Sequence, residues 1–209
     1  MVRDVIYDIL PDIWPMVIII TVIVSTLRLA YVTRNKKSFC LYKELLGLMF
    51  MIYILCLFHV VTFQDVNYGT NNFIPFKEIL RYDVGSYKFI RNIIGNIVMF
   101  IPYGFFASYY LKNRKFGTIA FLTLIVSTTI EFVQMYIGRV FDIDDIILNL
   151  VGGIVGFLLF VGLDAIKSKL PKVFSSNWFL NLVVIILIIL MVVYLFNINI
   201  FGLYKLGWI

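Results

Sequence analysis

Long apolar segments alternate with short polar connections along the whole chain. Each segment is close to the about 20 residues that an α-helix needs to cross the hydrocarbon core of a bilayer. Few charged residues fall inside the segments, which cover residues 13–32, 45–63, 93–111, 117–137, 146–163 and 179–196. This pattern predicts an all-α fold, a polytopic membrane helix bundle with about six transmembrane helices.

Composition supports this prediction and narrows the function classes. Of the 209 residues, 62% are hydrophobic and 14% are charged, whereas soluble domains are about half apolar and about one-quarter charged. We therefore expect an integral membrane protein with almost no soluble domain. Cys40 and Cys56 provide no disulfide framework and no metal-ligand spacing.

The net charge of +6 is distributed unevenly between the connections. The loops after the first, third and fifth segments hold ten of the eighteen basic residues and only two acids, Glu44 and Asp164. Basic residues gather in the cytoplasmic loops of membrane proteins. The charge is thus interpreted as asymmetry across a bilayer rather than as nucleic-acid binding, and both termini are predicted to be extracytoplasmic.

One long connection, residues 64–91, lies on the predicted outer side. It contains Pro75, which suits the first turn of a helix. Phe76, Ile79 and Leu80 would share one side of such a helix. This pattern predicts a short helix in the membrane interface, or a re-entrant segment.

A dense group of polar residues separates the fourth and fifth segments, where ionisable residues are costly. Asp142 or Asp144 could cap the fifth helix, which would explain one of the aspartates. Closely spaced acids need a counterion, either an arginine or a divalent cation held by carboxylate and amide oxygens. The group comprises Glu131, Gln134, Arg139, Asp142, Asp144, Asp145 and Asn149.

Two further patterns concern contacts between helices. Asn92 and Asn96 are four residues apart, so they are expected to face the same way and to hydrogen-bond across helices. Gly152, Gly153 and Gly156 are expected to permit close helix packing. Glu131 could be structural, bonded to an asparagine or to Arg139, or it could line a polar cavity.

The polar residues, taken in order, resemble the VanZ-like family of small bacterial membrane proteins, over roughly residues 45–163. The matching elements are Asn72-Phe73-Ile74-Pro75-Phe76, Asn92-x3-Asn96-x3-Phe100-x-Pro102-x-Gly104, Glu131-x2-Gln134 and Gly138-Arg139-x2-Asp142-Ile143-Asp144-Asp145-x3-Asn149-x2-Gly152. The resemblance implies a multi-pass protein of the bacterial cell membrane and a link to lower susceptibility to teicoplanin-type lipoglycopeptides. It supplies no reaction.

The resemblance also suggests a division of the chain. We expect an N-terminal transmembrane helix and basic loop over residues 1–44 and a VanZ-like four-helix core over residues 45–163. A C-terminal helix and aromatic tail would occupy residues 164–209.

Two hypotheses follow for the polar group. In the first, it forms an outer-leaflet pocket for an amphiphile: a membrane lipid, a lipid-linked envelope precursor or a lipoglycopeptide. In the second, the protein is an intramembrane hydrolase or headgroup transferase with carboxylates as acid and base. A transporter ranks below both, because no inverted repeat is visible.

Both hypotheses draw on the same candidate residues. Candidate catalytic residues are Glu131, Asp142 and Asp145. Candidate ligand-binding residues are Asn72, Arg91, Asn92, Asn96, Gln134, Arg139 and Asn149. No metal site and no cofactor is assigned, although a divalent cation at the acids stays an alternative.

Overall fold

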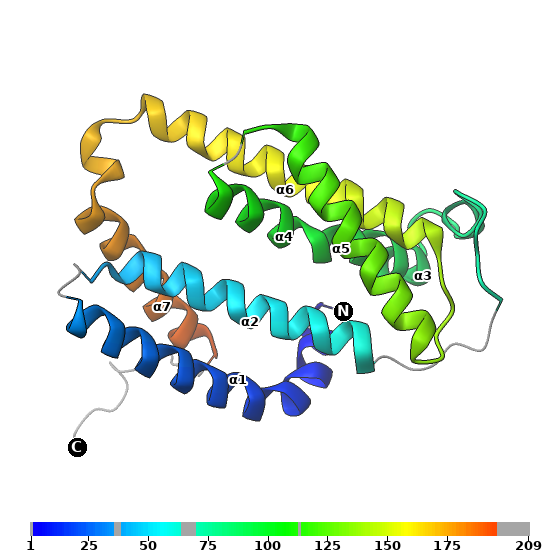
Figure 1. Cartoon of the computed structure of the whole chain (residues 1–209), viewed down its shortest axis with the longest axis horizontal. Helices are drawn as coiled ribbons and strands as arrows, with labels where there is room; N and C mark the ends of the chain where they lie inside the picture. The colour runs from blue at the N-terminus through cyan, green and yellow to red at the C-terminus, as the bar shows by residue number, and fades with distance from the viewer. Residues whose placement is uncertain (1, 36–38, 64–69, 113, 196–209) are drawn as a thin grey trace, which may run out of the picture.

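The computed structural model describes residues 2–35, 39–63, 70–112 and 114–195 (Figure 1). These residues form helices, with no strand beyond one isolated parallel bridge. The helices are α1 (Val2–Arg34), α2 (Leu41–Phe63), η1 (Ile79–Arg81), α3 (Tyr87–Phe89), η2 (Ile90–Ile94), α4 (Gly95–Leu111), α5 (Phe116–Tyr136), α6 (Ile143–Lys169), η3 (Lys172–Ser175) and α7 (Asn177–Leu195). The predicted all-α class is confirmed.

Five helical spans in the described part of the chain are long and apolar enough to cross a membrane. They are Trp14–Arg34, Leu41–Thr62, Tyr87–Leu111, Phe116–Tyr136 and Ile143–Lys169. The protein is therefore a multi-pass membrane protein. The sixth predicted span corresponds to α7, whose apolar stretch in the described part of the chain, Asn177–Leu190, is shorter. The aromatic tail lies outside the described residues.

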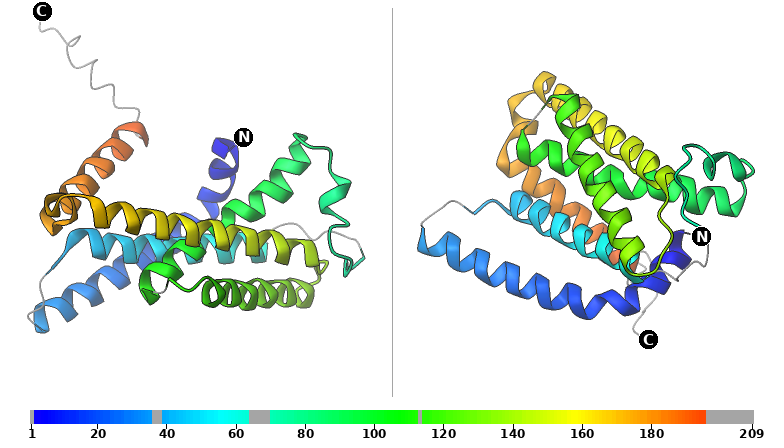
Figure 2. Two further views of the ribbon diagram at one scale, coloured as in Figure 1. Left: turned by 90° about the horizontal axis from the view of Figure 1, so that it is seen from above. Right: turned by 45° about the vertical axis from the view of Figure 1, so that its right-hand side comes forward.

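The core is the packing of α6 against α4 and α5 (Figures 1 and 2). A Cβ atom built on Gly152 would lie 2.1 Å from the carbonyl oxygen of Ile97. One built on Gly156 would lie 2.0 Å from that of Ile101, and Gly104 meets Gly153 equally closely. The backbones of α4 and α6 thus touch directly, and the predicted role of the glycines in close packing is confirmed.

The outer helices join this core through a few specific contacts. Leu57 and Val61 of α2 pack against the buried Phe100 of α4. At the other end of α2, Glu44 forms a two-pronged ion pair with Arg28 of α1, at 2.6 Å and 3.0 Å. These contacts fix α2 between the core and α1.

The segment before α4 differs from its prediction in two ways. The short helix expected near Pro75 is a single 3-10 turn, η1, which follows a run of turns over residues 75–78. The third span begins earlier than predicted, at Tyr87, and includes the π-helix η2. A π-helical segment places residues out of phase with an α-helix, so the faces of α3 and α4 do not continue in register.

Candidate functional site

The polar group gathers at one end of the bundle, where α5 turns into α6. Gly138 adopts φ +88°, a conformation that favours glycine, immediately after α5. The amide of Arg139 donates to the carbonyl of Gln134 at 2.9 Å, and that of Gly138 donates to Met135 at 3.2 Å. This pair of bonds is a Schellman motif. It ends α5 and directs the chain back towards the bundle.

Asp142 starts α6. Its carboxylate accepts the amide N–H of Asp144 at 2.9 Å, so it is the N-cap of that helix, as one of the sequence alternatives predicted. It also accepts the side-chain amide of Asn72 at 2.8 Å. Burial raises the pKa of Asp142 above its usual range, and these two hydrogen bonds oppose that rise.

Asn72 attaches the outer loop to this turn. Its amide donates to the carbonyl of Phe141 at 2.8 Å, and its carbonyl accepts from Ile143 at 3.0 Å. The side-chain oxygen of Asn71 also accepts the amide N–H of Phe141 at 3.0 Å. The loop thus runs beside the start of α6 as a one-residue parallel strand pair, centred on Asn72 and Asp142.

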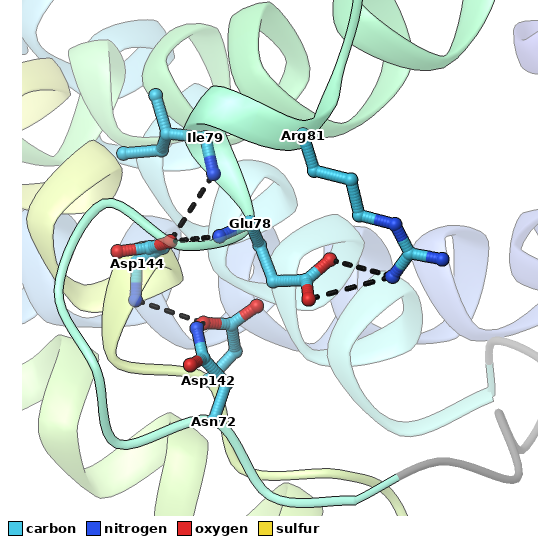
Figure 3. A network of polar contacts seen from close by, with 6 residues as sticks. All are labelled: Asn72, Glu78, Ile79, Arg81, Asp142 and Asp144. Atoms are coloured by element: carbon cyan, nitrogen blue, oxygen red, sulfur yellow. Dashed lines mark hydrogen bonds and ion pairs between the residues drawn. The ribbon is translucent and has the colours of Figure 1, made fainter.

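Asp144, which the sequence pattern suggested only as an alternative helix cap, holds the outer loop in place. Its carboxylate accepts three loop amides: that of Phe76 at 2.5 Å, and those of Glu78 at 2.7 Å and Ile79 at 3.2 Å, which Figure 3 shows. Its residue surface is only 1% exposed. Phe76 adopts φ +66°, which is uncommon for a bulky residue, and this bend directs its amide to the carboxylate. Asp144 therefore clamps the loop rather than capping the helix.

Glu131 lies beneath the turn and is 1% exposed. One of its oxygens accepts the amide of Asp142 at 3.0 Å. The other accepts the side-chain amide of Gln134 at 2.9 Å, in the amide orientation that satisfies both neighbours of Gln134. In that orientation the oxygen of Gln134 accepts from Arg139 at 2.8 Å. Arg139 also donates to the carbonyl of Val61 at 2.9 Å, so this chain of bonds links α5, the turn and α2.

Asp145 and Asn149 occupy the next two turns on one face of α6. Asn96 of α4 donates to one oxygen of Asp145 at 2.5 Å. Asn149 is 2% exposed and donates to the hydroxyl of Ser127 in α5 at 2.9 Å. Its oxygen has no hydrogen-bond partner among the described residues. This face therefore retains unused hydrogen-bonding capacity, unlike Glu131.

Arg91 and Asn92, two predicted ligand-binding residues, lie apart from these bonds. Both belong to the π-helix η2, and Arg91 is exposed. In the described part of the chain, neither makes a hydrogen bond or ion pair to the polar group. Of the two asparagines, Asn96 donates across helices to Asp145, as predicted, whereas no such bond is found for Asn92 in the described residues.

The acids show no metal-binding arrangement. Across residues 2–35, 39–63, 70–112 and 114–195, no three or more His, Cys, Asp or Glu side chains are grouped so that they could hold a metal ion. Asp142 and Asp144 instead direct their oxygens at backbone amides. These amides, together with Arg139, offset the negative charge that suggested a cation.

The fold and this polar group define a class: a multi-pass helical membrane protein with buried carboxylates clamping a loop at one end. Comparison with known proteins specifies the family. The VanZ/LLP1 family profile matches residues 45–167, and the chain belongs to that family.

One similar curated protein is Protein VanZ from Enterococcus faecium. It is 33% identical over 106 residues, which are 47% of this chain and 62% of the relative. The chain thus matches less than two thirds of the length of that relative. No solved structure matches.

Proposed function

We propose that the protein binds an amphiphile at the loop-covered end of the bundle and thereby lowers bacterial susceptibility to teicoplanin-type lipoglycopeptides. The site would face the outer leaflet, as the distribution of basic residues predicts. Membership of the VanZ/LLP1 family and similarity to Protein VanZ support the setting. The proposal for the ligand rests on the clamped loop.

The loop is held by polar bonds on one side and exposes apolar side chains on the other. Phe73, Ile74, Phe76 and Leu80 are all exposed, Leu80 by 81%. Exposed apolar area costs about 25 cal/mol per Å² in water, so such a surface favours acyl chains or an apolar ligand tail. Asp144 fixes this apolar surface beside the polar end of the bundle. An apolar surface next to polar groups is the complement of an amphiphile.

The first test replaces the clamp. Asp144→Asn keeps the size of the side chain but places an amide donor among three backbone donors, which leaves at least one buried group unpaired. We expect the variant to reach the membrane at normal levels and to lose the reduction in teicoplanin susceptibility. Asp164→Asn is the matched control, because Asp164 is a half-buried acid that pairs with Arg114 at the other end of the bundle. Full activity of Asp144→Asn at normal membrane levels would contradict the proposal.

The second test changes the apolar surface alone. Leu80→Ser removes an exposed side chain that contributes little to packing, so the fold should persist. We expect the variant to protect less against teicoplanin. Susceptibility to a glycopeptide that lacks an acyl tail should not change. Val173→Ser, also at an exposed apolar position, serves as the control. Equal effects of both variants would show that the loop surface is not specific.

An intramembrane enzyme is the second candidate, and one observation favours it. Asp145 is only partly buried, and a single hydrogen bond to it, from Asn96, is found in the described region. The unpaired oxygen of Asn149 lies one turn further along α6. Under this proposal Asp145 acts as acid or base, while Glu131 and Asp142 position the turn. Asp145→Asn should then abolish conversion of a lipid-linked substrate, detected by mass spectrometry of extracted lipids, while a binding protein would release the substrate unchanged.

A further inference from the structure

One cavity in the described part of the chain lies far from the polar group. It has a volume of about 740 Å³, between α1 and α2 at the end of the bundle that carries Arg28 and Lys43. Small-ligand sites commonly occupy about 300–1,000 Å³. The cavity is therefore large enough for a ligand, and neither proposal above uses it.

The walls of this cavity are mainly apolar, and its rim is basic. Leu29, Leu45, Leu48 and Met51 contribute to the walls. The rim carries Arg28, Lys43 and Glu44, so its formal charge is +1. An apolar space with a positively charged edge has the form of a site for an anionic amphiphile.

The two cations of the rim have different partners. The guanidinium of Arg28 is held by both oxygens of Glu44, and this ion pair fixes the spacing of α1 and α2. The ammonium of Lys43 lies 5.6 Å from the ring centroid of Tyr42. No carboxylate pairs with Lys43 within the described residues. Lys43 is thus the cation available to an anionic ligand.

The helices that flank the cavity indicate whether its ligand is a lipid or a soluble molecule. Both α1 and α2 are long and apolar enough to cross the membrane, and residues of theirs that do not line the cavity, such as Ile23 and Met49, are exposed. A cavity between two such helices opens towards hydrocarbon, where water is scarce. Basic pockets between transmembrane helices are known to bind anionic lipid headgroups.

We propose that this cavity is a binding site for one anionic phospholipid of the leaflet at the basic end. An acyl chain fills the space between α1 and α2, and the phosphate lies at Lys43 beside the Arg28–Glu44 pair. The lipid supports the attachment of α1 beside that ion pair. This site is separate from the amphiphile site proposed at the opposite end.

The test uses the full chain purified in a mild detergent and titrated with phosphatidylglycerol or with phosphatidylcholine of the same acyl chains. We expect phosphatidylglycerol to bind more tightly and to raise the melting temperature more. Lys43→Gln should weaken phosphatidylglycerol binding about fivefold and leave phosphatidylcholine unchanged. Equal binding of both lipids by the unmodified protein would overturn the proposal.

A second variant tests the cavity itself. Gly47 lines the cavity, and a Cβ atom built on it would lie 3.5 Å from the hydroxyl of Tyr110, an ordinary contact. Gly47→Leu should fill the space and abolish the response to phosphatidylglycerol. Gly162→Leu adds the same side chain where no atom lies within 4 Å, and it should bind as the unmodified protein does. Retained binding by Gly47→Leu, or a lipid-free dimer in native mass spectrometry, would refute the site.

Discussion

Gly156→Ala tests whether α6 and α4 are in backbone contact. The added methyl group would lie 2.0 Å from the carbonyl oxygen of Ile101 and 2.7 Å from the amide nitrogen of Phe105. Since real Cβ contacts are rarely below 3.0 Å, the helices would have to separate by about 1 Å. Both neighbouring atoms are backbone, so no side-chain rotation relieves the clash.

The expected cost follows from this geometry. Overpacking a well-packed core typically costs about 1–3 kcal/mol. For a chain of this size, 1 kcal/mol corresponds to about 2–4 °C in melting temperature, so Gly156→Ala should lower it by about 2–12 °C. Separation of α4 from α6 also moves Asn96 away from Asp145. We therefore expect reduced protection against teicoplanin in the same variant.

The assay is thermal unfolding in detergent, with membrane expression measured in parallel. Gly162→Ala is the matched control, because Gly162 also lies in α6 but has no neighbour within 4 Å. That control should melt at the same temperature as the unmodified protein or higher, since alanine favours helix by about 1 kcal/mol over glycine. If both variants melt alike, α4 and α6 do not touch in the way described.

Two further predictions concern single contacts. Asn149→Ala and Ser127→Ala, combined in a double-mutant cycle of unfolding free energies, should show a coupling of about 0.6–2 kcal/mol, because their side chains share a hydrogen bond; a coupling of zero would contradict that bond. Arg28→Glu should loosen α1, detected as faster proteolysis of the N-terminal region, and the added change Glu44→Arg should restore protection by re-forming the pair with reversed charges. Failure of the double variant to recover would show that the pair does not hold α1.

The helices and their closest packing could be predicted because both depend on local patterns. A run of about 20 apolar residues is sufficient to indicate a span, and glycines spaced along α6 indicate a backbone contact. The role of Asp142 as N-cap was equally local. Glu131 and Gln134 lie three residues apart in α5, a spacing that by itself places them on one face.

The clamp at Asp144 could not be predicted, because its partners are distant in sequence and carry no side-chain signature. Its contact with Phe76 spans 68 positions and uses only backbone amides. The π-helix could not be predicted either, since nothing in Ile90–Ile94 distinguishes a π-helix from an α-helix. Sequence patterns identified the polar residues, whereas the structure determined which of them hold the loop.

The separation between the loop and its clamp has a consequence for biosynthesis. Glu78 is made 66 residues before Asp144, and chains grow at about 5–20 residues per second. The apolar loop is therefore synthesised about 3–13 s before Asp144, to which it binds. Both α4 and α5 are synthesised during this interval, because they lie between Glu78 and Asp144 in the chain. Docking of the loop is thus a late event in assembly, and it completes the polar end of the bundle only once α6 has begun.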